Sequence, residues 1–267
     1  MKTESIDFKE LSKISIDLRN RIIHRLNIRG GGHYGGSLSV LEILISLYYK
    51  VIETDNLRSG NKIRDKIILS KGHASIALYS VLHSLELISD QDYESYGIDG
   101  AKLSGHPDML CSDLIEFSTG SLGQGLSAAI GMAFILKSYG KQTWTILGDG
   151  ECQEGQIWEA ASLAPRYNLG NVNVIVDSNK FQEYGWHKFE EISINEPLPS
   201  PLLKWRAFGW HAVEVNGHNF DELLAAMNAA RANTSQPSVI IAHTIKGKGV
   251  PAFEQDPFIS HCTSLNS

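Results

Sequence analysis

The chain has 267 residues, of which 42% are hydrophobic and 20% are charged, the composition of a globular protein that can bury a sizeable core. Its formal net charge of −6 argues against a general nucleic-acid or anionic-membrane binder, because both need a basic surface, so any phosphate must be captured locally. The three cysteines are too scattered for a disulfide framework, and neither a signal-peptide core nor a membrane-length apolar run occurs, so we expect a soluble cytoplasmic protein.

The first predicted element is an amphipathic helix from Phe8 to Leu26. Its apolar residues recur at spacings of three and four, which places them on one helix face: Leu11, Ile14, Leu18, Ile22 and Leu26. The helix stops at RGGGHYGGSLS, Arg29 to Ser39, where five glycines let the backbone approach a ligand closely. Ser39 and Glu42 then form a capping-box pattern, which predicts that a helix starts again there.

Short β-type runs alternate with helical stretches along the rest of the chain. The expected strands are Ile67–Ser70, Trp144–Leu147, Val172–Val176, His211–Val215 and Ser238–Ala242, with helices such as Leu126–Leu136 and Asp221–Ala232 between them. This alternation predicts one α/β domain over residues 1–267, with a parallel sheet covered by helices on both faces. Glu190–Pro201 holds three prolines and is expected to be a surface loop.

Two of the expected strands, joined by one helix, make up the segment from Ile146 to Gln182. The first strand ends at Asp149 within GDG, and the second ends at Asn179 within DSN. Both residues should emerge side by side, because the carboxyl ends of parallel strands share one edge of the sheet, where open α/β sheets bind ligands. Their oxygens suit Mg²⁺ or Ca²⁺, and the glycines beside Asp149 would let backbone N–H groups reach a diphosphate.

The order GDG, about thirty residues, then Asn resembles the thiamine diphosphate signature of transketolases and their relatives. A lone GDG is more often a simple turn, but the strand, helix, strand, Asn arrangement makes the match far more specific. In that family the Asp, the Asn and a main-chain carbonyl two residues after the Asn bind the metal, which implies Asp149, Asn179 and Phe181 here. The resemblance thus implies thiamine diphosphate and Mg²⁺ (or Ca²⁺), with Asn179, Gly150 and Glu151 also contacting the cofactor.

Four histidine segments resemble the transketolase site and occur in the family's order. GGHYGGSLS supplies His33, which by resemblance contacts the hydroxyl end of the donor sugar. LSKGHAS supplies His73 as a diphosphate contact, and LSGHPD supplies His106 beside the reacting carbon. KGKGV followed by His261 resembles the segment whose histidine faces both diphosphate and substrate, although the tryptophan that usually precedes it is absent. The remaining histidines, among them His218, are expected to be structural.

Two further segments match the family. STGSLGQG resembles the TGPLGQG loop, which implies that Gly120, Ser121 and Leu122 lie against the thiazolium ring and keep water from it. Glu154 and Glu159 lie where transketolases carry glutamates at the dimer interface that couple the two cofactor sites. Acidic residues near a helix start are also favourable in any protein, so a purely local role stays open for both.

A partner subunit is implied because a full-length transketolase continues for several hundred residues beyond the part that matches IKGKG, whereas this chain ends shortly after it. The absent part binds the aminopyrimidine ring and the phosphate of the sugar. We therefore expect an α₂β₂ assembly with a C-terminal transketolase-like subunit. The expected reaction transfers a two-carbon ketol unit from a ketose to an aldehyde or carrier-bound acceptor, with His33, His106 and His261 orienting hydroxyls and moving protons.

Three alternative functions stay open at this stage. The chain also resembles 1-deoxyxylulose-5-phosphate synthase in its glycine-rich segment, and it shares the diphosphate motif with the α subunit of 2-oxo acid dehydrogenases. LSKGHAS and LSGHPD fit transketolase better than either. A noncatalytic regulatory subunit of the same fold is the third alternative, but such a protein is expected to lose its metal ligands first, and Asp149 and Asn179 are both present.

Overall fold

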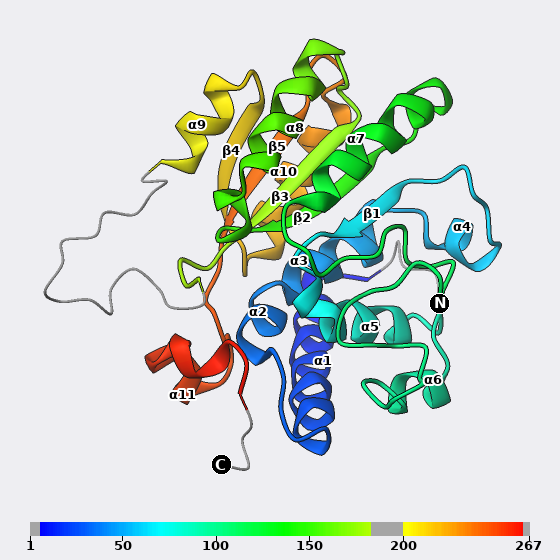
Figure 1. The fold of residues 1–267 in the computed structure, drawn as a ribbon, viewed down its shortest axis with the longest axis vertical. Helices are drawn as coiled ribbons and strands as arrows, with labels where there is room; N and C mark the ends of the chain where they lie inside the picture. The colour runs from blue at the N-terminus through cyan, green and yellow to red at the C-terminus, as the bar shows by residue number, and fades with distance from the viewer. Residues whose placement is uncertain (1–5, 183–199, 264–267) are drawn as a thin grey trace, which may run out of the picture.

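A five-stranded parallel β-sheet forms the centre of the protein (Figure 1). The computed structural model describes residues 6–182 and 200–263. The strands follow the spatial order β1-β2-β3-β5-β4, and each neighbouring pair is parallel. Their bounds are Lys66–Leu69 (β1), Thr143–Gly148 (β2), Val172–Ser178 (β3), His211–Asn216 (β4) and Ser238–His243 (β5). The α/β fold, the parallel sheet and all five expected strands are therefore confirmed, with boundaries shifted by one or two residues.

Helices cover both faces of this sheet (Figure 1). One layer holds α7 (Gln124–Leu136), α8 (Gly155–Arg166) and α9 (Pro201–Ala207). The opposite layer holds α1 (Phe8–Ile28), α2 (Tyr34–Ser39), α3 (Leu41–Ser46), the π-helical turn η2 (Leu47–Val51), α4 (Thr54–Arg58), α5 (Ser75–Ser84), α6 (Asp90–Glu94) and α10 (Phe220–Ala232). Near the C-terminus follow α11 (Pro251–Gln255) and the 3₁₀ turn η6 (Pro257–Ser260). None of the helices within 6–182 and 200–263 has the length and hydropathy to cross a membrane.

The strands divide their side chains between two hydrophobic cores. In β3, Val174 and Val176 enter the core beneath α7, α8 and α9, whereas Ile175 enters the core beneath α1, α3 and α10. β5 repeats this alternation with Ile241 and Ile240. Because both faces of β2, β3 and β5 are covered, these strands read mostly as apolar runs, whereas the edge strand β4 alternates buried and exposed side chains.

The helix start predicted near Ser39 is confirmed by α3, but the capping box between Ser39 and Glu42 does not form. α2 ends at Ser39 and α3 begins at Leu41, and neither helix has a side-chain cap. The Ser39 hydroxyl instead donates to Asp177 Oδ2 at 2.6 Å, and the Glu42 carboxylate pairs with the Arg19 guanidinium. Both side chains therefore find tertiary partners in place of the local backbone bonds that a capping box requires.

Only the first half of the glycine-rich run is a loop. Residues 30–32 have positive φ, whereas Gly35 and Gly36 lie inside α2. A Cβ at Gly35 would lie 2.4 Å from Ser260 Oγ, and one at Gly36 would lie 3.0 Å from His73 Nε2. The second pair of glycines thus serves close packing of α2 against the C-terminal segment and the His73 segment.

The surface loop expected from Glu190 to Pro201 lies outside the described residues up to position 199. Pro201 itself is the first residue of α9, a position where its missing N–H has no cost. The Ser200 side chain caps this helix by accepting from Leu203 N. The C-terminal end of the expected loop is therefore a helix start.

We expect Gly170→Ala to destabilise the fold. Gly170 precedes β3, and a Cβ there would lie 2.2 Å from the backbone oxygen of Thr234, which cannot move aside as a flexible side chain would. The expected loss in free energy of unfolding is about 1–3 kcal/mol, measured by urea denaturation. Gly131→Ala is the matched control: nothing lies within 4 Å of its added Cβ in the middle of α7, and there we expect a gain of about 0.5–1 kcal/mol. Equal effects at both positions would contradict the packing argument.

Candidate functional site

The carboxyl ends of β2 and β3 place Asp149 and Asn179 in adjacent loops. The strands pair through Gly148 and Asp177, so the residues that follow them leave the sheet together. The Asp149 carboxylate accepts from the backbone N–H of Gly150 at 2.8 Å and from that of Lys180 at 2.5 Å. The side-by-side arrangement expected from the sequence is therefore confirmed.

A cavity of about 350 Å³ opens at this edge of the sheet. Its walls come from segments far apart in the sequence: His33, Gly36, Lys71, His73, His106, Gly120, Leu122, Gly148, Asp149, Gly150, Glu151, Asn179, Phe181, Gln182, Lys246 and His261. Nearly all the residues expected from the sequence to contact a cofactor, metal or substrate are among them. Ser121 and Glu154 are the two that do not line this cavity.

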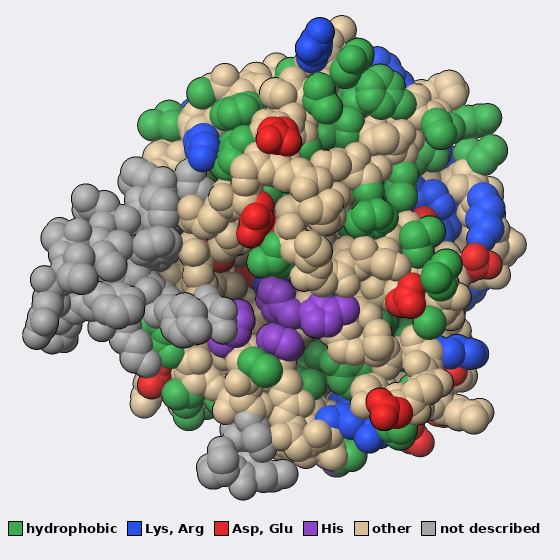
Figure 2. All heavy atoms as spheres, in the orientation of Figure 1, with side chains coloured by type: hydrophobic (Ala, Val, Ile, Leu, Met, Phe, Trp, Pro, Cys, Tyr) green, Lys and Arg blue, Asp and Glu red, His purple; other side chains and the backbone are tan. Residues whose placement is uncertain are grey.

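Four histidines from four segments meet at the cavity, and Figure 2 shows histidine side chains gathered in one patch of this face. The His33 ring centroid lies 5.3 Å from that of His73, 6.2 Å from that of His106 and 5.8 Å from that of His261. The rings of His73 and His261 are 5.9 Å apart. The structure thus brings together the four histidines that the sequence analysis selected.

The C-terminal segment is tied to the glycine-rich loop and to the cavity. Gly32 and Thr263 exchange two backbone hydrogen bonds of 2.9 and 3.1 Å, which brings His261 next to the glycine-rich loop. The buried Lys246 ammonium lies 3.1 Å from His261 Nδ1 and donates to the Phe181 carbonyl at 2.8 Å. Lys246 belongs to the KGKGV segment but is not among the site residues predicted from the sequence.

A second lysine that the sequence analysis missed lies beneath the cavity. Lys71 Nζ is 2.5 Å from Asp177 Oδ2 and donates to the Gly36 carbonyl at 3.0 Å. The Asp177 carboxylate also accepts from the hydroxyls of Ser39 and Thr244, so four segments meet at one buried ion pair. The usable signal was a lysine directly after an expected strand, together with an aspartate two residues before Asn179 in the DSN motif.

The Glu151 carboxylate connects three loops through hydrogen bonds. It is buried, and its two carboxylate oxygens accept from Ser70 Oγ at 2.5 Å, Gly123 N at 2.9 Å and Gly148 N at 3.1 Å. Burial raises the pKa of Glu151, and these three hydrogen bonds partly oppose that shift. The carboxylate therefore joins the GDG, LSKGH and TGSLGQG segments.

The TGSLGQG loop and Glu154 differ in their relation to the cavity. Gly120 has φ +147°, a conformation that favours glycine, and its Cα faces the His106 ring, where an added Cβ would lie 3.4 Å from Cδ2. Gly120 and Leu122 line the cavity, whereas Ser121 is exposed and does not line it. Glu154 is exposed beside Gly123, outside the cavity, and its expected place at a subunit interface stays a prediction.

Burial shifts the protonation equilibria of the cavity residues in opposite directions. Burial, followed by the nearby Asp177 carboxylate, raises the pKa of Asp149 to about 6. Burial and then the Lys246 charge lower the pKa of His261 to about 4, and burial with the Lys71 charge lowers the pKa of His73 well below its usual value. At neutral pH these two rings are therefore uncharged, while Asp149 is ionised next to a second carboxylate.

The oxygen donors at the sheet edge fit a hard divalent cation. Asp149 supplies a carboxylate, Asn179 an amide oxygen and Phe181 a carbonyl, and Phe181 N donates to Asn179 Oδ1 at 3.1 Å, which holds their loop together. Within the described residues no cluster of three or more His, Cys, Asp or Glu could hold a metal. A cation here would therefore need further oxygens from water or a diphosphate, which is the coordination that Mg²⁺ favours, and its charge would relieve the Asp149–Asp177 repulsion.

Sequence comparison gives a family match over most of the chain. Residues 13–267 match the family model described as transketolase, thiamine diphosphate binding domain. The 6-deoxy-6-sulfo-D-fructose transketolase subunit of a Clostridium species is 38% identical over 267 residues, which cover 99% of this chain and 94% of that protein. One subunit of the apulose-4-phosphate transketolase of Phocaeicola vulgatus is 36% identical over 238 residues, covering 88% of this chain and 83% of that one.

Comparison with solved structures gives the same fold. A crystal structure of transketolase from Campylobacter jejuni superposes with a TM-score of 0.86 at 30% identity. The match covers 97% of this chain but only 41% of that one. Human transketolase, 33% identical over 240 residues, is covered to 37% of its length. The chain therefore spans about two fifths of these longer proteins and nearly the whole of the Clostridium subunit.

We expect the stability of the chain to rise with pH between about 4 and 6.5, with His261 as one contributor. Its folded pKa of about 4 lies below the unfolded value of 6.5, so the unfolded chain binds more protons in this pH range. This proton binding favours unfolding at low pH, and the free energy of unfolding therefore increases as the pH rises. His261→Gln should reduce the rise by about 1–2 kcal/mol, an allowance for screening at this partly exposed ring. The measurement is urea denaturation at pH 5 and pH 7.5.

The control for this prediction is His24→Gln on the exposed side of α1, which should leave the pH dependence of the parent chain unchanged. His33 and His73 also have lowered pKa values and, like His261, make stability rise with pH, whereas the raised pKa of Asp149 makes stability fall. His261→Gln should therefore reduce the slope of stability against pH without abolishing it. An unchanged slope in His261→Gln would show that its ring titrates as in the unfolded chain.

Proposed function

Because the chain belongs to the transketolase family and contains its thiamine diphosphate binding domain, we propose that it holds this cofactor through a divalent cation and, with a partner subunit, transfers a two-carbon ketol unit. The observation that carries the proposal is the cavity at the ends of β2 and β3, where Asp149, Asn179 and four histidines meet. The donor is a ketose, and the acceptor is an aldehyde or a carrier-bound group.

The metal ligands in this proposal are Asp149, the Asn179 side chain and the Phe181 carbonyl, with Mg²⁺ (or Ca²⁺) as the ion. Their hard oxygens and the raised pKa of Asp149 support it, because a cation at that point removes the repulsion between neighbouring carboxylates. The diphosphate would be held by His73, the backbone of Gly150 and the two buried lysines, all of which line the cavity. These cations give an acidic protein a local site for an anion.

Thiamine diphosphate supplies the electron sink for cleavage of the bond beside the ketose carbonyl. The chain's own contribution is orientation and proton transfer by His33, His106 and His261, whose rings face one cavity from three segments. Lowered pKa values keep His33 and His261 neutral, so His33 can accept a proton or a hydrogen bond from a sugar hydroxyl. The Nδ1 of His261 faces the Lys246 ammonium, so the ring proton lies on Nε2, which would donate to a sugar oxygen. Gly120 and Leu122 form the wall that limits access of water.

The partner in this proposal is a C-terminal transketolase-like subunit that forms an α₂β₂ complex in the cytoplasm. Apolar side chains on the outer face of α7 and in the loop after His106 support such contacts: Phe134 is 47% exposed, Ile135 68% and Leu110 88%. Glu154 lies beside the N-terminus of α7. A cavity of 350 Å³ is at the small end for a cofactor site, in keeping with one completed by a second chain.

The proposed substrate class depends on which part of the ketose each of the two subunits would recognise. The relatives are named for 6-deoxy-6-sulfo-D-fructose and apulose-4-phosphate, two ketoses that carry different anionic groups. We assign the shared ketol end to the histidine cavity of this chain and the distal anionic group to the partner subunit. The net charge of −6 supports this division, since an acidic chain does not attract anions over its surface as a whole.

We expect Asp149→Ala to weaken thiamine diphosphate binding in the presence of Mg²⁺ by at least about 100-fold, or roughly 2.8 kcal/mol, because the only carboxylate of the proposed ligand set is lost. Calorimetric titration of the full chain measures the affinity, and circular dichroism verifies the fold. Glu214→Ala removes an exposed carboxylate of β4 and should bind like the parent. Equal affinity of the Asp149 variant and the parent would remove this residue from the metal site.

We expect ketol transfer from xylulose 5-phosphate only when the chain is co-expressed with a C-terminal transketolase-like subunit. Light scattering after gel filtration should give the mass of two copies of each subunit. Turnover by the isolated chain at the rate of the complex would contradict the split-enzyme proposal. Pyruvate decarboxylation by the complex, without ketose consumption, would replace ketol transfer by 2-oxo acid chemistry.

A further inference from the structure

A tight turn from Ile245 to Gly249 presents the cavity lysine, Lys246. Gly247 has φ +76° and Gly249 has φ +87°, a region that favours glycine. A Cβ at Gly249 would lie 2.3 Å from Arg19 Cδ, so the turn is wrapped directly over the arginine side chain. The position of the Lys246 ammonium therefore depends on what holds the two ends of this turn.

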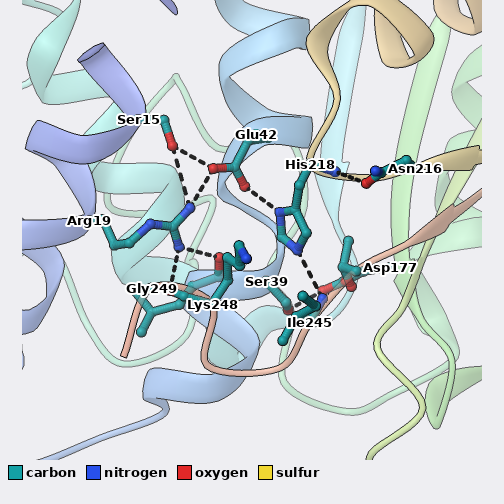
Figure 3. A network of polar contacts seen from close by, with 12 residues as sticks. Ser15, Arg19, Ser39, Glu42, Asp177, Asn216, His218, Ile245, Lys248 and Gly249 are labelled. Carbon is teal, nitrogen blue, oxygen red and sulfur yellow. Dashed lines mark hydrogen bonds and ion pairs between the residues drawn. The ribbon is translucent and has the colours of Figure 1, made fainter. Parts of the chain in front are cut away.

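Arg19 of α1 holds the C-terminal end of the turn. Its Nη1 donates to the Lys248 carbonyl at 2.7 Å and to the Leu38 carbonyl at 2.9 Å (Figure 3). Its Nη2 pairs with the Glu42 carboxylate and lies 3.4 Å from Ser15 Oγ. One guanidinium thus joins α1, α2, α3 and the turn, and only the planar fork of an arginine can do so in several directions at once.

His218, in the loop between β4 and α10, holds the N-terminal end. The backbone N–H of Ile245 donates to its Nε2 at 2.9 Å, and its Nδ1 lies 2.9 Å from Glu42 Oε2 (Figure 3). An acceptor at Nε2 requires the proton of the neutral ring at Nδ1, where it is donated to the carboxylate. Both ring nitrogens of His218 therefore form hydrogen bonds, so the ring does more than pack in the interior.

Glu42 connects the two ends. Its side chain is 7% exposed, and one oxygen faces Arg19 while the other faces His218. Burial by itself would raise the pKa of Glu42, but the His218 hydrogen bond and the Arg19 charge outweigh it and lower the pKa, so the group is ionised. A charged relay at this depth holds its partners in one geometry, since any displaced member is left unpaired.

We propose that Arg19, Glu42 and His218 form a positioning relay that clamps both ends of the Ile245–Gly249 turn and so sets Lys246 for binding of the cofactor diphosphate. None of the three lines the cavity, so they act through the turn and not by touching the ligand. The inference rests on the proposed function for the identity of that ligand. The clamp itself is independent of it.

The clamp matters because Lys246 is fully buried and makes directional contacts. Its ammonium donates to the Phe181 carbonyl at 2.8 Å and lies 3.1 Å from His261 Nδ1. Release of the Ile245 N–H would let the turn shift by a fraction of an ångström, enough to move the ammonium away from both groups. Loss of binding affinity, and not only of stability, is then expected when the relay is broken.

His218→Ala tests the relay at its outer end, because removal of Arg19 or Glu42 leaves a buried charge unpaired and can unfold the chain. We expect hydrogen exchange of residues 245–250 to accelerate and the Kd for thiamine diphosphate with Mg²⁺ to rise at least about 10-fold, measured by calorimetry on the full chain. His218→Gln keeps an acceptor that reaches the Ile245 amide. It should bring the Kd back to within about 3-fold of the parent.

His83→Ala is the matched control. Its ring is 14% exposed against 12% for His218, it pairs with Asp90 at 2.7 Å, and it stacks on Tyr93 at 4.4 Å, far from the turn. We expect His83→Ala and His218→Ala to lower the melting temperature by similar amounts, but His83→Ala should leave the Kd for thiamine diphosphate unchanged. An unchanged Kd and unchanged exchange in His218→Ala, or an equal rise of Kd in His83→Ala, would overturn the relay. If the parent chain binds no thiamine diphosphate either alone or with a co-expressed partner subunit, the proposed function fails, and the exchange rates alone still decide the clamp.

Discussion

The buried ion pair between Lys71 and Asp177 is the interaction on which the rest of the site depends. Its two charged groups have almost no contact with solvent and lie directly beneath the cavity. Ser39 and Thr244 donate to the same carboxylate, so the pair ties α2 and the ends of β1, β3 and β5 to one point. Buried charges tolerate little displacement, since each would be left without a partner in a medium of low dielectric constant. The ion pair therefore fixes the floor of the cavity, and the positions of the loops that carry the site residues depend on it.

The charge distribution around that floor prepares the cavity for an anion bound with a cation. The ammonium groups of Lys71 and Lys246 are buried, and two of the histidines beside them have pKa values lowered by burial and by those ammonium groups. Asp149 shows the opposite shift because it is buried and lies close to Asp177. Binding of the proposed metal and diphosphate would offset both effects, because Asp149 would face the cation and the ammonium groups would face the phosphates.

Much of the fold and of the site could be predicted from the sequence. Most of the strands are mainly apolar runs, and GDG and DSN each lie at the end of a strand, so the rule that parallel strands end at one edge was enough to bring Asp149 and Asn179 together. The histidines beside Gly32, Gly72 and Gly105 were recognised because their segments and order match one family. Ser121 was carried over by the same matching but is exposed and does not line the cavity, since position in a motif does not state which way a side chain points.

The sequence by itself determined which segments form the strands and the main helices, most of the residues that line the cavity, and the edge of the sheet at which they gather. Those properties depend on local apolar periodicity and on chain connectivity. Only the tertiary structure decided the partners of the buried polar groups. Ser39 and Glu42 have a complete local capping pattern, yet they bond to Asp177 and Arg19, which are 138 and 23 residues away. An unpaired buried charge costs far more free energy than a missing helix cap, so these side chains bond to their long-range partners. The local sequence pattern contains no information about those partners.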